Sequence, residues 1–155
     1  MTNKKELTDD DYMTPKSVWE SIKVYLPTDK VIWEAFYGDG KSGEYLRELG
    51  FSVIHEDIDF FKEDKGDIIV SNPPFSKKKQ VLTRLKALNK PFVMVLPAST
   101  LGTKMLRNLF PDIQIIIPNG RVEFIKNGKQ TKGVWFSSFL YCWKMNLPRD
   151  IVWLD

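Results

Sequence analysis

Residues 31–50 read VIWEAFYGDGKSGEYLRELG, and this stretch decides the fold. The apolar run at 31–36 predicts a buried strand, 38–40 a tight loop, and 41–49 a helix that a glycine ends. The same patterns return along the chain as strands at 51–54, 67–71, 92–96 and 113–117, with helices at 77–89 and 99–110. Strands that are apolar on both faces and alternate with helices predict an α/β fold with a mostly parallel sheet and helices on both faces.

The two ends of the chain depart from this alternation. Residues 121–125 and 133–143 flank a turn signal at Asn127-Gly128 with no helical pattern between them, which predicts a C-terminal antiparallel hairpin that closes the sheet. Near the start, Thr14 is expected to cap a helix with Pro15 in its first turn, and Ser99 to cap the helix at 99–110.

Length and composition limit the kind of protein. A chain of 155 residues with 43% hydrophobic residues predicts one domain over residues 12–155, preceded by a flexible polar arm at 1–11. The single cysteine, Cys142, and the single histidine, His55, argue against an internal disulfide and against a metal site. Because no apolar run reaches the roughly 20 residues of a membrane span, we expect an intracellular protein without a membrane segment.

A second decisive motif, Asn72-Pro73-Pro74-Phe75, directly follows the strand at 67–71. Neither proline donates a backbone N–H, and each holds the residue before it in extended geometry. The side-chain oxygen of Asn72 and the carbonyl of Pro73 are therefore two fixed acceptors beside an aromatic ring. This arrangement suits a planar ring with an exocyclic amino group, whereas the structural alternative is a Pro-Pro turn with Phe75 in the core.

The loop Gly38-Asp39-Gly40 is expected at the carboxyl end of the first strand, where open α/β sheets bind ligands. Its glycines let the backbone approach a ligand closely, and acidic residues after the second strand could bind ribose hydroxyls. Residues 35–42 also satisfy a loose phosphate-loop pattern, with Lys41 on terminal phosphates and Ser42 on magnesium. That alternative requires an aspartate where this chain has Asn72.

The motifs, taken in order, resemble a known family. Thr14-Pro15, residues 34–40, Asp57 with 59–61, and residues 72–75 are similar to the motifs of S-adenosylmethionine-dependent methyltransferases that modify amino groups. They look most like the small phage- and virus-type adenine-N6 methyltransferases, over residues 12–143. The resemblance implies a Rossmann-like class I methyltransferase fold with S-adenosylmethionine as cofactor.

The resemblance also implies a role for each matched residue. The methionine end of the cofactor would be cradled by Glu34, Phe36, Gly38 and Gly40, with Thr14 and Pro15 closing over it. Asp57 would bind the ribose, with Glu56 as the alternative, and Asp59 and Phe60 would contact the adenine of the cofactor. The target adenine would be held by Asn72, Pro73, Pro74 and Phe75, the last by stacking.

Two basic groups flank the expected site and predict nucleic-acid contact. Lys77 and Lys78 follow the 72–75 motif, and Arg121 and Lys126 belong to the predicted hairpin. Only 37 residues separate Glu34 from Asn72, so we expect no separate recognition domain. An unpaired adenine, in DNA in preference to RNA, would then be the favoured substrate, with a specificity subunit or a homodimer as further sources of specificity.

Two other functions fit parts of the pattern. Glutamine-modifying methyltransferases of release factors use a similar Asn-Pro-Pro motif, but typically with tyrosine where this chain has Phe75. The other interpretation is a non-catalytic subunit that binds the cofactor or acts as a nucleic-acid adaptor. The intact acceptors and ring of residues 72–75 argue against it, because an inactive subunit has no chemical need for them.

Overall fold

The computed structural model describes residues 12–126, 129–130 and 137–155, but not the side chains of residues 126, 129 and 130. The predicted arm at 1–11 and the predicted turn at Asn127-Gly128 lie outside these residues. Among the described residues, no helix combines the length and the apolar character needed to cross a membrane.

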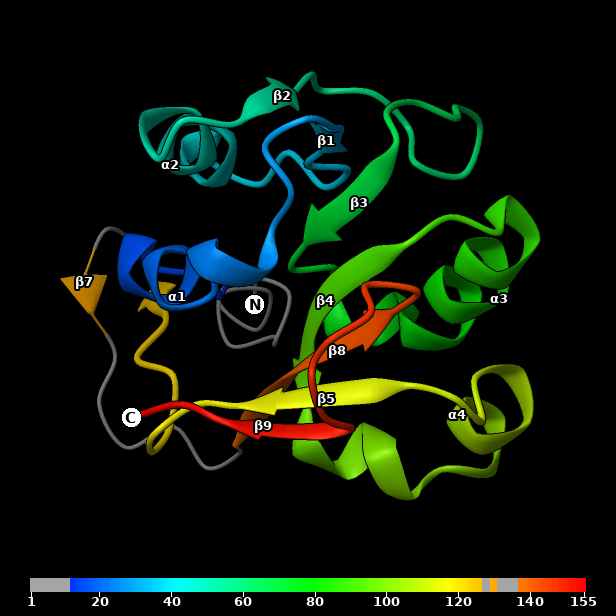
Figure 1. Cartoon of the computed structure of the whole chain (residues 1–155). Helices are drawn as coiled ribbons and strands as arrows, with labels where there is room; N and C mark the ends of the chain where they lie inside the picture. The colour runs from blue at the N-terminus through cyan, green and yellow to red at the C-terminus, as the bar shows by residue number, and fades with distance from the viewer. Residues whose placement is uncertain (1–11, 127–128, 131–136) are drawn as a thin grey trace, which may run out of the picture.

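A seven-stranded sheet in the order β2-β1-β3-β4-β8-β5-β9 runs through the molecule (Figure 1). All neighbouring strands are parallel except those that pair with β8, which confirms the predicted mostly parallel sheet. The strands are β1 (Val31–Trp33), β2 (Ser52–Ile54), β3 (Ile68–Ser71), β4 (Phe92–Pro97), β5 (Gln114–Ile117), β8 (Ser138–Trp143) and β9 (Ile151–Trp153).

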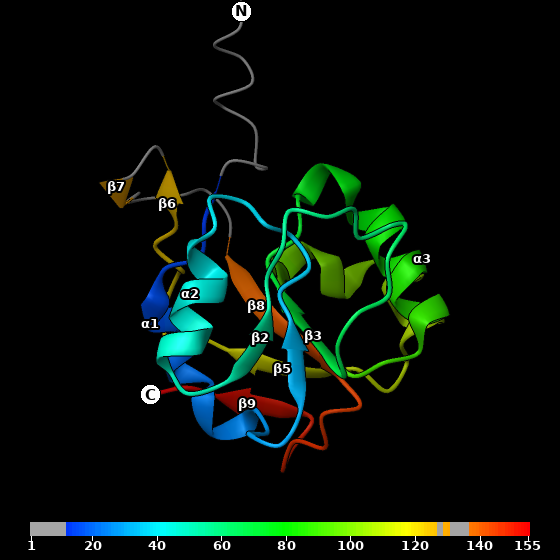
Figure 2. The same cartoon turned by 90° about the horizontal axis from the view of Figure 1, so that it is seen from above.

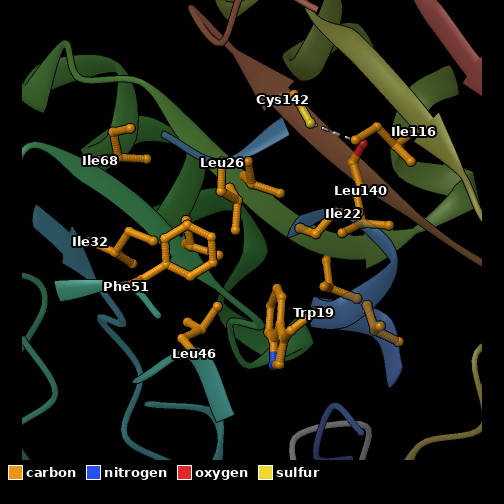
Figure 3. Close-up of a cluster of buried hydrophobic side chains, with 14 of the residues drawn as sticks. Trp19, Ile22, Leu26, Ile32, Leu46, Phe51, Ile68, Ile116, Leu140 and Cys142 are labelled. Atoms are coloured by element: carbon orange, nitrogen blue, oxygen red, sulfur yellow. Dashed lines mark hydrogen bonds between the residues drawn. The ribbon is translucent and has the colours of Figure 1, made fainter. Parts of the chain in front are cut away.

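Helices cover both faces of the sheet, as predicted (Figure 2). One face packs against α1 (Lys16–Ser21) and α2 (Lys41–Glu48), through a cluster that includes Trp19 and Leu46 (Figure 3). The other face packs against α3 (Lys78–Leu88) and α4 (Lys104–Leu109), through a cluster that includes Leu82 and Leu106. Short 3₁₀ turns connect these elements: η3 (Lys23–Tyr25), η4 (Phe75–Lys77) and η5 (Ala98–Gly102).

An antiparallel pair flanks the turn predicted at 127–128, but it is shorter than predicted and separate from the seven-stranded sheet. β6 (Ile125–Lys126) and β7 (Lys129–Gln130) pair with each other as a separate two-stranded ribbon. β8 instead inserts between β4 and β5 and is antiparallel to both. The side chains of Leu140, Tyr141 and Cys142 are fully buried, so this strand is stabilised in the sheet interior rather than at an edge.

Two predicted helix caps are wrong. α1 begins at Lys16 with Pro15 at its N-cap, so Thr14 lies outside the helix, because the backbone at Pro15 is extended (φ −73°, ψ 156°). At α4 the hydroxyl of Thr103, rather than of Ser99, accepts a hydrogen bond from the N–H of Leu106 at 3.2 Å. Ser99 lies within η5, whose 3₁₀ turns precede the α-helix.

β9 has no counterpart among the predicted elements. It has three residues, of which only Val152 is buried, and this pattern is too short to signal a strand from sequence. Pairing with β5 gives it a parallel register in which Ile116 faces Val152.

Candidate functional site

A cavity of about 450 Å³ lies at the carboxyl ends of β1, β2 and β3. Parallel strands end at the same edge of the sheet, so segments far apart in sequence meet there. The volume is that of a small-molecule site. Of the predicted site residues, the cavity is lined by Thr14, Glu34, Phe36, Gly38, Asp57, Asp59, Phe60, Asn72, Pro73, Pro74 and Lys77.

The other predicted site residues do not line this cavity. Pro15 and Arg121 line a separate hollow of about 400 Å³. The half-buried ring of Phe75 packs edge-on against Phe124, with ring centroids 6.4 Å apart. The remaining three are Gly40, which precedes α2, Lys78, which begins α3, and Lys126, whose side chain lies outside the described part of the structure.

Glu34 is a buried acid in the wall of the cavity, with only 1% of its surface exposed. Its carboxyl oxygen Oε1 accepts hydrogen bonds from the N–H of Phe36, at 3.0 Å, and from the hydroxyl of Ser71. Burial raises the pKa of Glu34 to about 8, although both hydrogen bonds act in the opposite direction. The carboxyl group is therefore mainly protonated at neutral pH, and a nearby cation would favour its ionised form.

The side-chain amide of Asn72 is oriented by the N-terminal segment. Its Nδ2 donates a hydrogen bond to the carbonyl oxygen of Tyr12 at 2.9 Å, whereas its Oδ1 is buried without a partner among the described residues. Met13 in turn exchanges two backbone hydrogen bonds of 2.8 Å with Ile125 in β6. The hydroxyl of Thr14 is also buried without a partner in the described structure. Two residues that line the cavity, Asn72 and Thr14, thus each keep a buried polar atom with unused hydrogen-bonding capacity.

The loop between β1 and α2 depends on its glycines. Gly38 has φ 58° and Gly40 has φ 85°, in the left-handed region that favours glycine. A Cβ added to Gly38 would lie 3.0 Å from the sulfur of Met13. The loop therefore brings bare backbone up to the cavity, with the N-terminal segment packed directly over it.

The acidic segment after β2 forms another wall. Asp57 lines the cavity and Glu56 does not, which favours Asp57 as the residue for a ligand hydroxyl. Asp59 accepts a hydrogen bond from the N–H of Phe61 at 2.8 Å and so stabilises a local turn. The buried ring of Phe60 packs against Phe36 with centroids 4.8 Å apart.

Several lining residues had no assigned role in the predicted cofactor and target-base site. They are Tyr12, Met13, Ala35, Tyr37, Asp39, Ser42, Ile58 and Phe61. All of them lie within or close to predicted motifs in sequence, and this position was the available signal. The hydroxyl of Ser42 accepts a hydrogen bond from the indole N–H of Trp19 at 3.2 Å. In the part of the chain that the structure describes, no three His, Cys, Asp or Glu side chains are grouped to hold a metal ion.

The buried acid predicts how stability depends on pH. The folded-state pKa of Glu34, about 8, lies above its ordinary value of 4.5, so its stabilising contribution is complete below pH 4.5 and is lost as pH rises through 8. Glu34→Gln removes this loss. We expect its Tm to exceed that of the parent by about 5 °C or more at pH 8.5, with a smaller difference at pH 5. Thermal melts across pH check this, with the exposed Glu44→Gln as control; equal pH dependence in Glu34→Gln and the parent would contradict it.

No protein-family model matches the sequence, and no curated protein matches it. The structure is similar to that of a Pyrococcus horikoshii protein proposed to be an RNA methyltransferase, with a TM-score of 0.53 and 15% identity over 92% of this chain and 97% of that one. This likeness shows the fold, a Rossmann-type α/β sheet.

Two further structures are similar at lower scores. The precorrin-6y C5,15-methyltransferase of Geobacter metallireducens has a TM-score of 0.45 and 11% identity over 88% of this chain and 95% of that chain. TrmN of Thermus thermophilus has a TM-score of 0.33 and 14% identity over 81% of this chain and 39% of its own.

Proposed function

We propose that this chain is a methyltransferase that uses S-adenosylmethionine to methylate the exocyclic N6 amine of adenine in nucleic acid. The observation that carries the proposal is the buried Oδ1 of Asn72. It has no partner among the described residues, and Asn72 lines a cavity that the glycine loop also lines. A buried acceptor without a donor costs about 1–3 kcal/mol, so a site that keeps one is built for a ligand that donates.

The walls of the cavity suit S-adenosylmethionine, which would supply an electrophilic methyl group. Glu34 lines the cavity. In our proposal it faces the ammonium and sulfonium charges of this cofactor, which would favour its ionised carboxylate. Thr14 and Gly38 also line the cavity and are proposed to close over the methionine end of the cofactor, and the carboxylate of Asp57 would accept hydrogen bonds from ribose hydroxyls. Phe60 and the turn at Asp59 would bound the adenine of the cofactor.

The 72–75 motif would act on the target base. The N6 lone pair of adenine is delocalised into the ring and is a weak nucleophile. Hydrogen bonds from the amino group to Asn72 Oδ1 and to the carbonyl of Pro73 favour the tetrahedral nitrogen that attacks the methyl carbon. As the new C–N bond forms and the methyl–sulfur bond breaks, positive charge develops on N6. The hydrogen bonds from the amino group to these acceptors therefore become stronger. The amine then loses one proton to solvent.

Phe75 and Pro74 complete this half of the site in our proposal. Pro74 (φ −62°) fixes the path of the chain from the motif into η4. Phe75 comes next and is half-buried, and it is proposed to stack on the target base, a contact worth about 1–3 kcal/mol.

Transfer of a labelled methyl group tests this function. The protein and labelled cofactor are incubated in separate reactions with duplex DNA, single-stranded DNA, RNA and a release factor. We expect label in nucleic acid. Label in the release factor alone would indicate a glutamine methyltransferase, and binding of the cofactor without transfer to any substrate would indicate an adaptor.

Substrate form is a further prediction. A paired base must be unstacked at a cost of a few kcal/mol, which contacts from a recognition domain can offset. Only α2, β2 and β3 lie between the glycine loop and Asn72, so no such domain is inserted there. We therefore expect faster methylation of adenine in single strands than in the same sequence as a duplex. Initial rates on matched oligonucleotides measure this, and a strong preference for one short duplex sequence would contradict it.

The basic residues are proposed to bind phosphates. Lys77 is exposed at the cavity, so Lys77→Ala should weaken oligonucleotide binding similarly across sequences and reduce the salt slope by about one. The double variant Arg121→Ala/Lys126→Ala tests the second group in the same titration. Lys104→Ala, at an exposed position of α4, is the control and should leave the salt slope unchanged.

A further inference from the structure

β9 forms one border of the sheet (Figure 1). It carries two exposed apolar side chains. Trp153 is 71% exposed and Ile151 is 48% exposed, whereas Val152 between them is 8% exposed. Among the described residues, no strand pairs with the outer side of β9. A bare, apolar edge strand is a template for pairing with another strand, and soluble proteins usually protect such edges.

The hydrogen bonds of β9 show which of its backbone groups face outward. The N–H of Ile115 donates to the carbonyl of Asp150 at 2.8 Å, and the N–H of Leu154 donates to the carbonyl of Ile117 at 3.0 Å. In a parallel ladder, alternate residues bond to the same neighbour. Residues 150, 152 and 154 therefore face β5. The N–H and C=O groups of residues 151 and 153 face away from the sheet.

This spacing of outward groups is self-complementary. If two copies meet antiparallel with the two-fold axis at Val152, Ile151 lies opposite the partner's Trp153, and these two residues use only their outward-facing groups. Val152 then faces the partner's Val152 as a pair without mutual hydrogen bonds. The cross-strand pairs also place a β-branched side chain beside an indole ring, which is a favourable combination.

The charges that flank β9 fit the same register. Arg149 and Asp155 are both exposed, and neither forms an ion pair within the described part of the chain. With the axis at Val152, Arg149 lies opposite the partner's Asp155, and the pair occurs twice by symmetry. A register shifted by two residues in either direction loses these pairs. Charge complementarity therefore selects a second copy of this chain, in this register, as the occupant of the edge.

We propose that two copies of this chain pair edge to edge through antiparallel β9 strands, with the two-fold axis at Val152. In this dimer the two sheets form one continuous sheet. The cavity lies at β1, β2 and β3, toward the edge of the sheet opposite β9, so pairing leaves it open in both copies. The proposal does not depend on the function proposed above.

Sedimentation equilibrium of the purified chain tests the dimer. We expect a species of twice 18.0 kDa, with a Kd on the order of 10 μM because the paired edge is short. Trp153→Lys should weaken association at least tenfold. Val24→Lys, which changes an 80% exposed residue of η3, should leave it unchanged. A chain that remains at 18.0 kDa at about 200 μM, or dimerisation that Trp153→Lys does not affect, would overturn the proposal.

Two further variants test the register itself. Arg149→Asp and Asp155→Lys should each weaken association, because each places like charges opposite one another, and the double variant should restore it. Val152→Cys should form a disulfide across the two-fold axis under mild oxidation, since the native Cys142 is buried. Single charge variants that dimerise like the parent, or absence of the cross-link in a folded Val152→Cys protein, would overturn this register.

Discussion

Asn72→Ala is expected to lower the turnover number for methyl transfer by about a hundredfold or more, with cofactor affinity within a few-fold of the parent. The substitution removes the buried Oδ1 that has no partner among the described residues and that we propose accepts from the amino group of adenine. The hydrogen bond to this acceptor becomes stronger as charge develops on N6. Its loss therefore raises the free energy of the transition state more than that of the bound substrate. Single-turnover rates with labelled cofactor measure the effect.

The control for this variant must separate chemistry from folding. Asn72 also donates to the carbonyl of Tyr12, so thermal melting should establish that Asn72→Ala is folded. Asn108→Ala, at an exposed position of α4, removes an amide far from the cavity and should keep parental turnover. Parental turnover in Asn72→Ala itself would remove the proposed role of the motif.

Gly38→Val is expected to weaken binding of S-adenosylmethionine at least tenfold. The backbone at Gly38 has φ 58°, which a β-branched residue adopts only with strain, and an added Cβ would lie 3.0 Å from the sulfur of Met13. The loop would have to shift, and it forms one wall of the cavity. Titration calorimetry with S-adenosylmethionine and with its demethylated product measures the loss.

Gly50→Val is the matched control, because Gly50 also has positive φ but lies in open space at the end of α2. It should lower stability without changing cofactor affinity. Equal losses of affinity in both variants would mean that Gly38 acts through stability alone. If instead ATP with magnesium binds, and Lys41→Ala abolishes that binding, the phosphate-loop interpretation is correct.

The parallel part of the fold could be predicted from sequence because β1, β3 and β4 are buried on both faces and read as unbroken apolar runs. The position of β8 could not, because its pairing with β4 and β5 is non-local and the turn signal at 127–128 suggested a nearer partner. The observed helix caps lie one residue (α1) and four residues (α4) after the predicted ones. The reason is that the extended backbone at Pro15 precedes α1 and the 3₁₀ turns of η5 precede α4.

The cavity lies where the predicted motifs follow strands, because the carboxyl ends of the parallel strands β1, β2 and β3 meet at one edge of the sheet. What sequence could not show is the contact between Asn72 and the carbonyl of Tyr12, or the bridge between Met13 and Ile125. Both contacts use backbone groups of residues 12 and 13, which leave no mark in residue type. The packing of Phe75 against Phe124 likewise depends on a segment about fifty residues later in the chain.

Nucleoside analysis of the methylated product tests directly whether the N6 amine of adenine is the methyl acceptor. Single-stranded oligonucleotide is incubated with the protein and S-adenosylmethionine, digested to nucleosides, and separated by chromatography with mass detection. We expect N6-methyladenine nucleoside with the parent chain, and about a hundredfold less of it with Asn72→Ala. Methylation of a ring carbon or of another base, or equal product with Asn72→Ala, would contradict it.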